Sequence, residues 1–135
     1  MLLKKRHYST LNMSIVEDFE KAIGRLKEVL ALEENDIVRD SAIKRFELCF
    51  DLAWKCIKTN AKYQGMECYS PRDCFKTAFQ LSLIDYDDCW LKMIDDRNLT
   101  VHLYKEEHAE EVYSRIGSYS ELFKKLLQNL KIKNG

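Results

Sequence analysis

Glycine and proline are scarce in this chain, and their scarcity constrains the fold more than any other feature of the sequence. Only four Gly and one Pro occur among 135 residues. An all-β domain needs a turn about every 8 to 12 residues, and Gly and Pro supply many of the turn conformations. The composition therefore argues strongly against an all-β fold and favours a few long helices.

The length and the charge balance narrow the class of protein further. A chain of 135 residues that is 46% hydrophobic can bury one core of its own, whereas two domains would be cramped. The 22 basic residues are balanced by 22 acidic ones. A zero net charge argues against a surface that grips nucleic acid everywhere, but it leaves room for a local basic groove.

Apolar residues recur three and four positions apart over most of the chain, which is the spacing of amphipathic helices. Ser14 and Glu17 form a capping box, Asn35 offers a second cap, Gly65 suits a helix end, and Ser70 precedes the only Pro. We expect helices over about 14–34, 36–63 and 70–83, a fourth that starts at 85, and a last one from about 105. Short connections predict an all-α, up-and-down antiparallel bundle of four to five helices.

The N-terminal segment is basic and has no apolar stretch of the kind that signal peptides contain. We interpret residues 1–12 as a disordered or extra leader and residues 13–135 as one helical domain. The longest stretch without Asp, Glu, Lys or Arg is Tyr8 to Val16, which is too short to span a membrane. The sequence thus predicts no membrane association.

Five cysteines occur, an odd number, and no two of them form a C-x-x-C pair. This is poor material for a zinc site or a disulfide framework, so we expect free thiols in a reducing cytoplasm. Cys49 and Cys56 lie in an apolar helical pattern and are expected to be small core residues. We assign no chemistry to the cysteines and expect neither a metal nor another cofactor.

The segment 90–104 concentrates polar groups where a core helix should end, and it contains the candidate site. Arg97 and His102 are five residues apart, so they would not share a face of a regular helix. Asn98 and Thr100 are mediocre helix formers, which makes a helix end between Arg97 and His102 plausible. On spacing alone, an Arg and a His near a helix end are more often a cap and a surface ion pair than a catalytic pair.

An Arg and a His that meet would suit phosphodiester cleavage. Histidine titrates near neutral pH and can relay a proton, and Arg can bind a phosphate with two hydrogen bonds. RNA carries its own nucleophile in the 2′-hydroxyl, so such a site can act without a metal.

The stretch Arg97-Asn98-Leu99-Thr100-Val101-His102 resembles the R-x4-H motif of HEPN domains, and Tyr104 extends it to R-x4-H-x-Y. The chain is similar to the HepT toxin branch, also described as nucleotidyltransferase substrate-binding proteins. Positions 45–55 in the second expected helix and 90–115 around the motif carry the likeness, which spans about 14–130.

The resemblance implies a HEPN-like bundle that forms a homodimer with the two motifs in one cleft. It implies a metal-independent endoribonuclease toxin that cleaves RNA, and a small nucleotidyltransferase of the MNT type, MntA, as its antitoxin. Carried over by position, Arg97 and His102 are catalytic, Asn98 binds phosphate or substrate, and Tyr104 receives AMP from the antitoxin. An AMP two residues from His102 would block RNA by charge and bulk.

Glu47 and Asp51 lie four apart on the second expected helix and so share one side of it. They are either a solvated face paired with lysines or a group that holds Arg97 or contacts the antitoxin. A basic cluster can likewise be solvated charge or the flank of an RNA groove. It comprises Lys55, Lys58, Lys62, Arg72 and Lys76. Three tyrosines are packing residues or base-stacking ones, namely Tyr63, Tyr69 and Tyr86.

Two other functions remain open at this point. The chain can be a non-catalytic nucleotide- or substrate-binding subunit of a minimal nucleotidyltransferase, in which Arg97 and His102 hold a phosphate. It can also be a helical interaction module in which the motif is a remnant. An assay for RNA cleavage distinguishes the ribonuclease toxin from these two functions.

Overall fold

The structure is a computed structural model that describes residues 2–103 and 105–134, with side-chain surroundings for 14–103 and 105–132. Every regular element in these ranges is a helix, which confirms the all-α prediction. The elements are α1 (Leu2–Leu30), α2 (Asp36–Tyr63), α3 (Pro71–Gln80), α4 (Cys89–Leu99), the single 3₁₀ turn η1 (Thr100–His102) and α5 (Glu106–Asn134).

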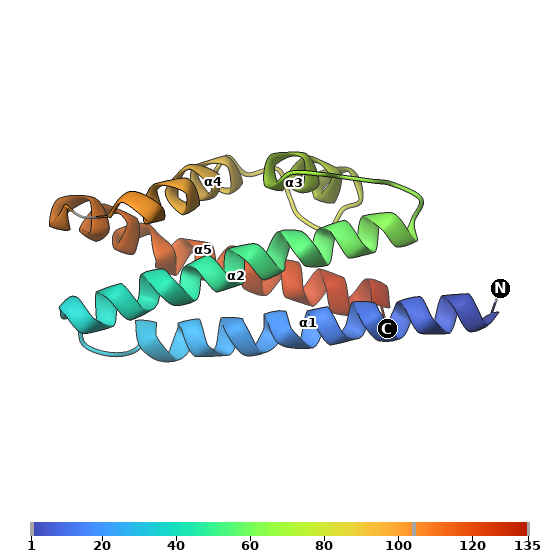
Figure 1. Ribbon diagram of the computed structural model, residues 1–135, viewed down its shortest axis with the longest axis horizontal. Coiled ribbons are helices and arrows are strands. Elements are labelled where there is room, and N and C mark those ends of the chain that lie inside the picture. The colour runs from blue at the N-terminus through green and yellow to red at the C-terminus, as the bar shows by residue number, and fades with distance from the viewer. Residues whose placement is uncertain (1, 104, 135) are drawn as a thin grey trace.

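The helices form an up-and-down bundle, as predicted, in which two short helices, α3 and α4, take the place of one long helix (Figure 1). The long helices α1, α2 and α5 pack against one another, and α1 and α2 run in opposite directions. The chain returns through α3, which packs on α2, and then α4, which packs on α3 and α5. Because α3 and α4 share this return, the candidate motif at the end of α4 reaches the same end of the bundle as the start of α5.

The predicted helix signals at three sites act as expected. The side-chain oxygen of Asn35 accepts a hydrogen bond from the Val38 amide at 2.9 Å, which caps α2. The Ser70 hydroxyl accepts from the Asp73 amide at 3.2 Å and caps α3. Gly65 follows α2 with a φ of +79°, a left-handed conformation that favours glycine.

Other helix boundaries differ from the predictions. The predicted start of the first helix at Ser14 is wrong, because α1 begins at Leu2 and Ser14 lies within it. Residues 2–13 contain no Gly or Pro, so nothing in them stops a helix from extending. α4 starts at Cys89 and not near residue 85. The Cys89 amide donates a hydrogen bond to the Asp87 carboxylate at 2.8 Å. The division of the chain at residue 12 stays a prediction.

One apolar core joins all five α-helices. Aromatic rings fill its centre, and the ring of Phe46 lies 5.5 Å from that of Tyr119 and 6.2 Å from that of Phe123, centroid to centroid. Cys49 and Cys56 are fully buried here, which confirms them as core residues. Burial raises the pKa of each of these two thiols to about 12.

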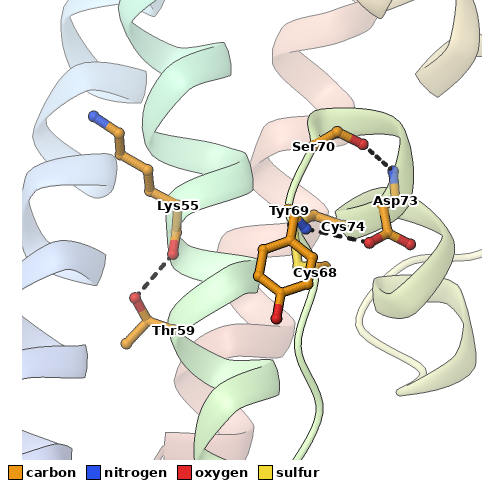
Figure 2. Close-up of a disulfide and its surroundings, with 7 residues drawn as sticks. All are labelled: Lys55, Thr59, Cys68, Tyr69, Ser70, Asp73 and Cys74. Atoms are coloured by element: carbon orange, nitrogen blue, oxygen red, sulfur yellow. Dashed lines mark hydrogen bonds between the residues drawn. A yellow bond between two sulfur atoms is a disulfide. The ribbon is translucent and has the colours of Figure 1, made fainter.

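The prediction that no cysteines pair is wrong, because Cys68 and Cys74 form a disulfide (Figure 2). The segment before α3 folds back onto the first turn of that helix, so the two Cα atoms are 5.0 Å apart. Sequence spacing does not show this approach, since it depends on the chain reversal at Ser70. Cys49, Cys56 and Cys89 are free. The disulfide removes the cysteine-based argument for a reducing compartment.

No helix within the described ranges combines the length and the hydropathy that crossing a membrane would require.

Candidate active site

The R-x4-H motif straddles a helix end, as the sequence predicts. Arg97 lies in the last turn of α4, the helix ends at Leu99, and the chain continues as η1 to His102. The Thr100 hydroxyl donates a hydrogen bond to the Arg97 carbonyl at 2.7 Å. The Arg97 carbonyl also accepts from the Thr100 amide, so the hydroxyl adds a second hydrogen bond at the end of α4.

The guanidinium of Arg97 is held by two carboxylates of α2. Its Nε and Nη2 donate to the two oxygens of Asp51 at 3.4 and 3.3 Å, and its Nη1 lies 3.5 Å from Glu47. The Nη1 also donates to the Thr100 hydroxyl at 3.1 Å. Of the two interpretations of Glu47 and Asp51, the structure shows the contact with Arg97. Lys44 contacts Glu47 as well, at 3.9 Å.

These contacts leave Arg97 oriented but still reachable. Its side chain is 22% exposed, compared with 18% for Glu47 and 40% for Asp51. The longest of its contacts joins it to Glu47, so a phosphate that replaced Glu47 at Nη1 would leave Asp51 in place as the orienting partner. Sequence spacing predicts the carboxylates but gives no sign of the contact with Thr100, which the sequence marks only as a weak helix former.

The other motif residues are placed less closely. His102 is exposed at the end of η1, and Asn98 is exposed on α4. Within the described part of the chain, no hydrogen bond or ion pair joins either residue to Arg97. Tyr104, the predicted site of modification, lies outside the described residues.

Asp96, next to Arg97, departs most from the sequence-based expectation. A charged residue on a helix is ordinarily expected to face solvent, but Asp96 is only 1% exposed. Its carboxylate accepts from Arg115 at 2.7 and 2.8 Å and from the Tyr119 hydroxyl at 2.5 Å. Val101, an apolar residue of the motif, is by contrast 69% exposed. The C-terminal end of α4 therefore contacts α5 through the charge pair of Asp96 and Arg115, and not through Val101.

This buried network perturbs the groups around it. The hydrogen bonds to Asp96 raise the pKa of Arg115, which therefore stays charged. Burial, followed by the hydrogen bond to Asp96, raises the pKa of Tyr119, which therefore stays protonated. Because Asp96 ties α4 to α5 while Arg97 ties it to α2, the motif is fixed between two long helices.

A groove opens beside this site between α2 and the start of α5. Its volume is about 330 Å³, and it reaches the Arg97 cluster through Glu47 and Thr100. Arg39 lies in its wall with a side chain that is 9% exposed, and contacts Glu106 at 3.3 Å. Leu103, which directly follows His102, also lines it. The groove thus connects the contacts of Arg97 with the start of α5.

No group of three or more His, Cys, Asp or Glu side chains is arranged to hold a metal ion in the part of the chain that the structure describes. The basic residues of the predicted cluster are exposed, three of them on α2 and two on α3.

Comparison with known proteins places this geometry in a family. The family described as "Nucleotidyltransferase substrate binding protein like" matches residues 15–132. The chain belongs to this family. The match includes every residue of the Arg97 cluster, so it confirms the resemblance that the motif indicates.

Individual proteins are also similar to the chain. A Haemophilus influenzae protein named probable ribonuclease HepT is 29% identical over 73% of each sequence. A crystal structure of a Thermus thermophilus protein has a TM-score of 0.78 and 35% identity, over 83% of this chain and 98% of that one. A mutant MntA–HepT toxin–antitoxin structure has a TM-score of 0.75 over 91% of this chain and 98% of that one. At 22% identity, this structural likeness shows a shared fold and nothing more.

Proposed function

We propose that the chain is the metal-independent ribonuclease toxin of a HEPN/MNT pair, the HepT/MntA type. The observation that carries the proposal is Arg97, held at a helix end by Glu47 and Asp51, with His102 exposed on the turn that follows. The Haemophilus influenzae relative named probable ribonuclease HepT supports it. The shared fold with the protein in the MntA–HepT structure is consistent with it.

In this mechanism the chain supplies a proton carrier and a cation. The 2′-hydroxyl oxygen of RNA attacks the neighbouring phosphorus and the bond from phosphorus to the 5′-oxygen breaks. One histidine accepts the 2′ proton, and another donates a proton to the departing 5′-oxygen. Arg97 offsets the negative charge that builds up on the phosphoryl oxygens. The products are a 2′,3′-cyclic phosphate and a 5′-hydroxyl end.

Two histidines are needed, and a homodimer with two motifs in one cleft supplies them. Apolar side chains near the motif support this arrangement, because Val101 on η1 is 69% exposed and Leu48, next to Glu47, is 52% exposed. Val101→Asp is expected to yield a monomer with greatly reduced cleavage. Sedimentation equilibrium and an RNA cleavage assay on the same sample check this, and a monomeric parent chain that cleaves RNA would contradict it.

The decisive test is cleavage of RNA in excess EDTA. His102→Ala is expected to lower the rate by about 100- to 10,000-fold, the usual contribution of a general acid or base. His108→Ala, which removes a histidine from α5 outside the motif, serves as the matched control. Arg97→Lys keeps the charge but loses the two-pronged geometry, and is expected to be nearly as impaired. If His102→Ala cleaves as fast as the parent, the site is wrongly assigned.

The proposed regulation is the transfer of AMP to Tyr104 by a small nucleotidyltransferase antitoxin. Such a partner and an RNA substrate would place the chain in the cytoplasm. Co-expression with a nucleotidyltransferase encoded by a neighbouring reading frame is expected to add the mass of AMP to the peptide that contains Tyr104. Tyr104→Phe should stay unmodified and toxic. An adduct on a different residue would contradict this part of the proposal.

The family description favours a second candidate function, a substrate-binding subunit of a nucleotidyltransferase. In that case the chain binds a nucleotide or its partner protein through Arg97 and His102 and cleaves nothing. Calorimetric titration with a nucleoside triphosphate, run beside the cleavage assay, separates the two functions.

A further inference from the structure

One face of α2 continues from the Arg97 site and carries a second cluster of polar and aromatic groups. Trp54 and Lys58 follow Asp51 at three and seven positions, so all three lie on the same side of the helix. Lys58 is about 10 Å further along the helix axis than Asp51. The cluster is therefore close enough to contact a strand whose phosphate lies at Arg97.

A lysine lies between two aromatic rings in this cluster. The Lys58 ammonium is 5.9 Å from the centroid of the Trp54 ring and 6.0 Å from that of the Tyr69 ring. Tyr69 comes from the segment before α3, and 72% of its surface is exposed. The two rings and the cation thus form a platform, defined here as Trp54, Lys58 and Tyr69, in which Trp54 is partly buried against the core and Lys58 and Tyr69 are exposed.

The backbone that carries the exposed ring of Tyr69 is anchored by the adjacent disulfide and by a hydrogen bond to Asp73 (Figure 2). The neighbouring Cys68 is bonded to Cys74 on α3, and both are fully buried. The Tyr69 amide donates to the Asp73 carboxylate at 3.2 Å, and its hydroxyl donates to Glu67. A ring held in this way keeps its place without being part of the core, which is the arrangement that a stacking contact requires.

We propose that the platform binds bases of single-stranded RNA next to the scissile phosphate. Aromatic rings beside a cation are the usual means by which proteins hold single strands without reading their sequence. The ammonium of Lys58 suits a backbone phosphate, and the neighbouring Lys55 and Lys62 add positive charge on α2. The identity of the substrate as RNA rests on the proposed function.

Another aromatic groove, between α3 and α4, fits an RNA strand less well. Its volume is about 420 Å³, and Phe79 and Tyr86 are exposed at its edge. Three acidic residues that flank Tyr86 in the sequence also line this groove, namely Asp85, Asp87 and Asp88. Arg72 and Lys76 also line the groove, but the three carboxylates next to Tyr86 outnumber these two cations and would repel a phosphate backbone, so Tyr86 provides a control rather than a second platform.

The test measures binding in the absence of cleavage. A fluorescently labelled, unstructured single-stranded RNA is titrated into the His102→Ala protein, and affinity is read by anisotropy. In this background Tyr69→Ala is expected to weaken binding by about 5- to 100-fold, the effect of losing one stacked base. Tyr69→Phe keeps the stacking ring and loses only the hydrogen bond to Glu67, so it should lose much less affinity than Tyr69→Ala. Tyr86→Ala, which removes a ring that is similarly exposed at 75%, should also leave the affinity unchanged.

The contribution of charge is tested in the same assay. Lys58→Gln is expected to weaken binding and to reduce the slope of affinity against salt concentration by about one unit. Lys21→Gln, which removes an exposed lysine from α1, should leave that slope unchanged. An equal loss in both variants would mean that only overall charge matters, and would overturn the platform.

Two further outcomes decide against the platform. Binding by Tyr69→Ala within twofold of the parent overturns it, as does a change of oligomeric state in that variant, which would make the surface a self-interface. Failure of the ribonuclease proposal is distinguishable. A parent chain that does not cleave, together with a Tyr69→Ala variant that loses binding, would leave a single-strand binding site without catalysis.

Discussion

The substitution Asp96→Asn is expected to destabilise the fold far more than the same substitution at an exposed helix position would. The carboxylate is 1% exposed and accepts three hydrogen bonds, two from Arg115 and one from Tyr119. An asparagine side chain at this position would retain one oxygen and would present an NH₂ group to these donors. The substitution thus removes the charge and leaves at least one buried donor without an acceptor.

The expected loss follows from the exposure of each partner. The Tyr119 hydroxyl is buried, and an unpaired buried donor costs about 1–3 kcal/mol. The Arg115 side chain is 30% exposed, so water replaces part of its lost pairing, and we assign it about 1 kcal/mol rather than the roughly 3–5 of a fully buried pair. The sum is about 3 kcal/mol, which corresponds to a fall in Tm of about 10 °C for a chain of this size.

Urea denaturation followed by circular dichroism measures this loss. Asp95→Asn is the matched control, because Asp95 is the adjacent residue and is exposed. In a Tyr119→Phe background the Asp96 substitution should cost about 2 kcal/mol less, since the unpaired hydroxyl is then absent. If the Asp96 and Asp95 variants unfold within about 0.5 kcal/mol of each other, the argument from the buried network is refuted.

Three further predictions concern thiols and the site. The free energy of unfolding, measured by urea titration, should fall as the pH rises from about 9 to 12. The reason is that the thiols of Cys49 and Cys56 have a pKa near 9 in the unfolded chain but near 12 in the fold. Replacing both residues by Ala should flatten the dependence of the unfolding free energy on pH. Cys68→Ser should destabilise the chain by about 2 kcal/mol, and reductant should do the same to the parent; an unchanged Tm would contradict the cross-link. Asp51→Asn should slow RNA cleavage by about 100-fold with little change in Tm, because Arg97 loses its orienting partner; an unchanged rate would assign the pair to structure alone.

The helix signals that could be predicted from the sequence are those set by neighbouring residues. Asn35, Gly65 and Ser70 act within one turn of their own position, and each behaves as its residue type predicts. Ser14 shows the opposite case. Its capping potential is local, but a helix can continue through a serine when the residues before it also favour helix, as they do here.

For the candidate site too, features set by short-range spacing could be predicted, and contacts between helices could not. Arg97 and His102 could be found from the motif, and Glu47 and Asp51 from their spacing on one helix face. That these carboxylates contact Arg97 could not be derived, because a helix face does not say which helix covers it. The burial of Asp96 was missed for a related reason, since a charged residue is assigned to solvent unless its partners on another helix are known.

The sequence by itself determined that the chain is helical, where most of its helices lie and which motif carries the candidate chemistry, because these depend on composition and short-range spacing. The tertiary structure decided the rest. The pairing of Cys68 with Cys74, the docking of Asp96 onto α5 and the position of Tyr69 over Lys58 each join residues from separate segments. Such contacts depend on how the helices rotate and pack against one another, and short-range patterns carry no record of that packing.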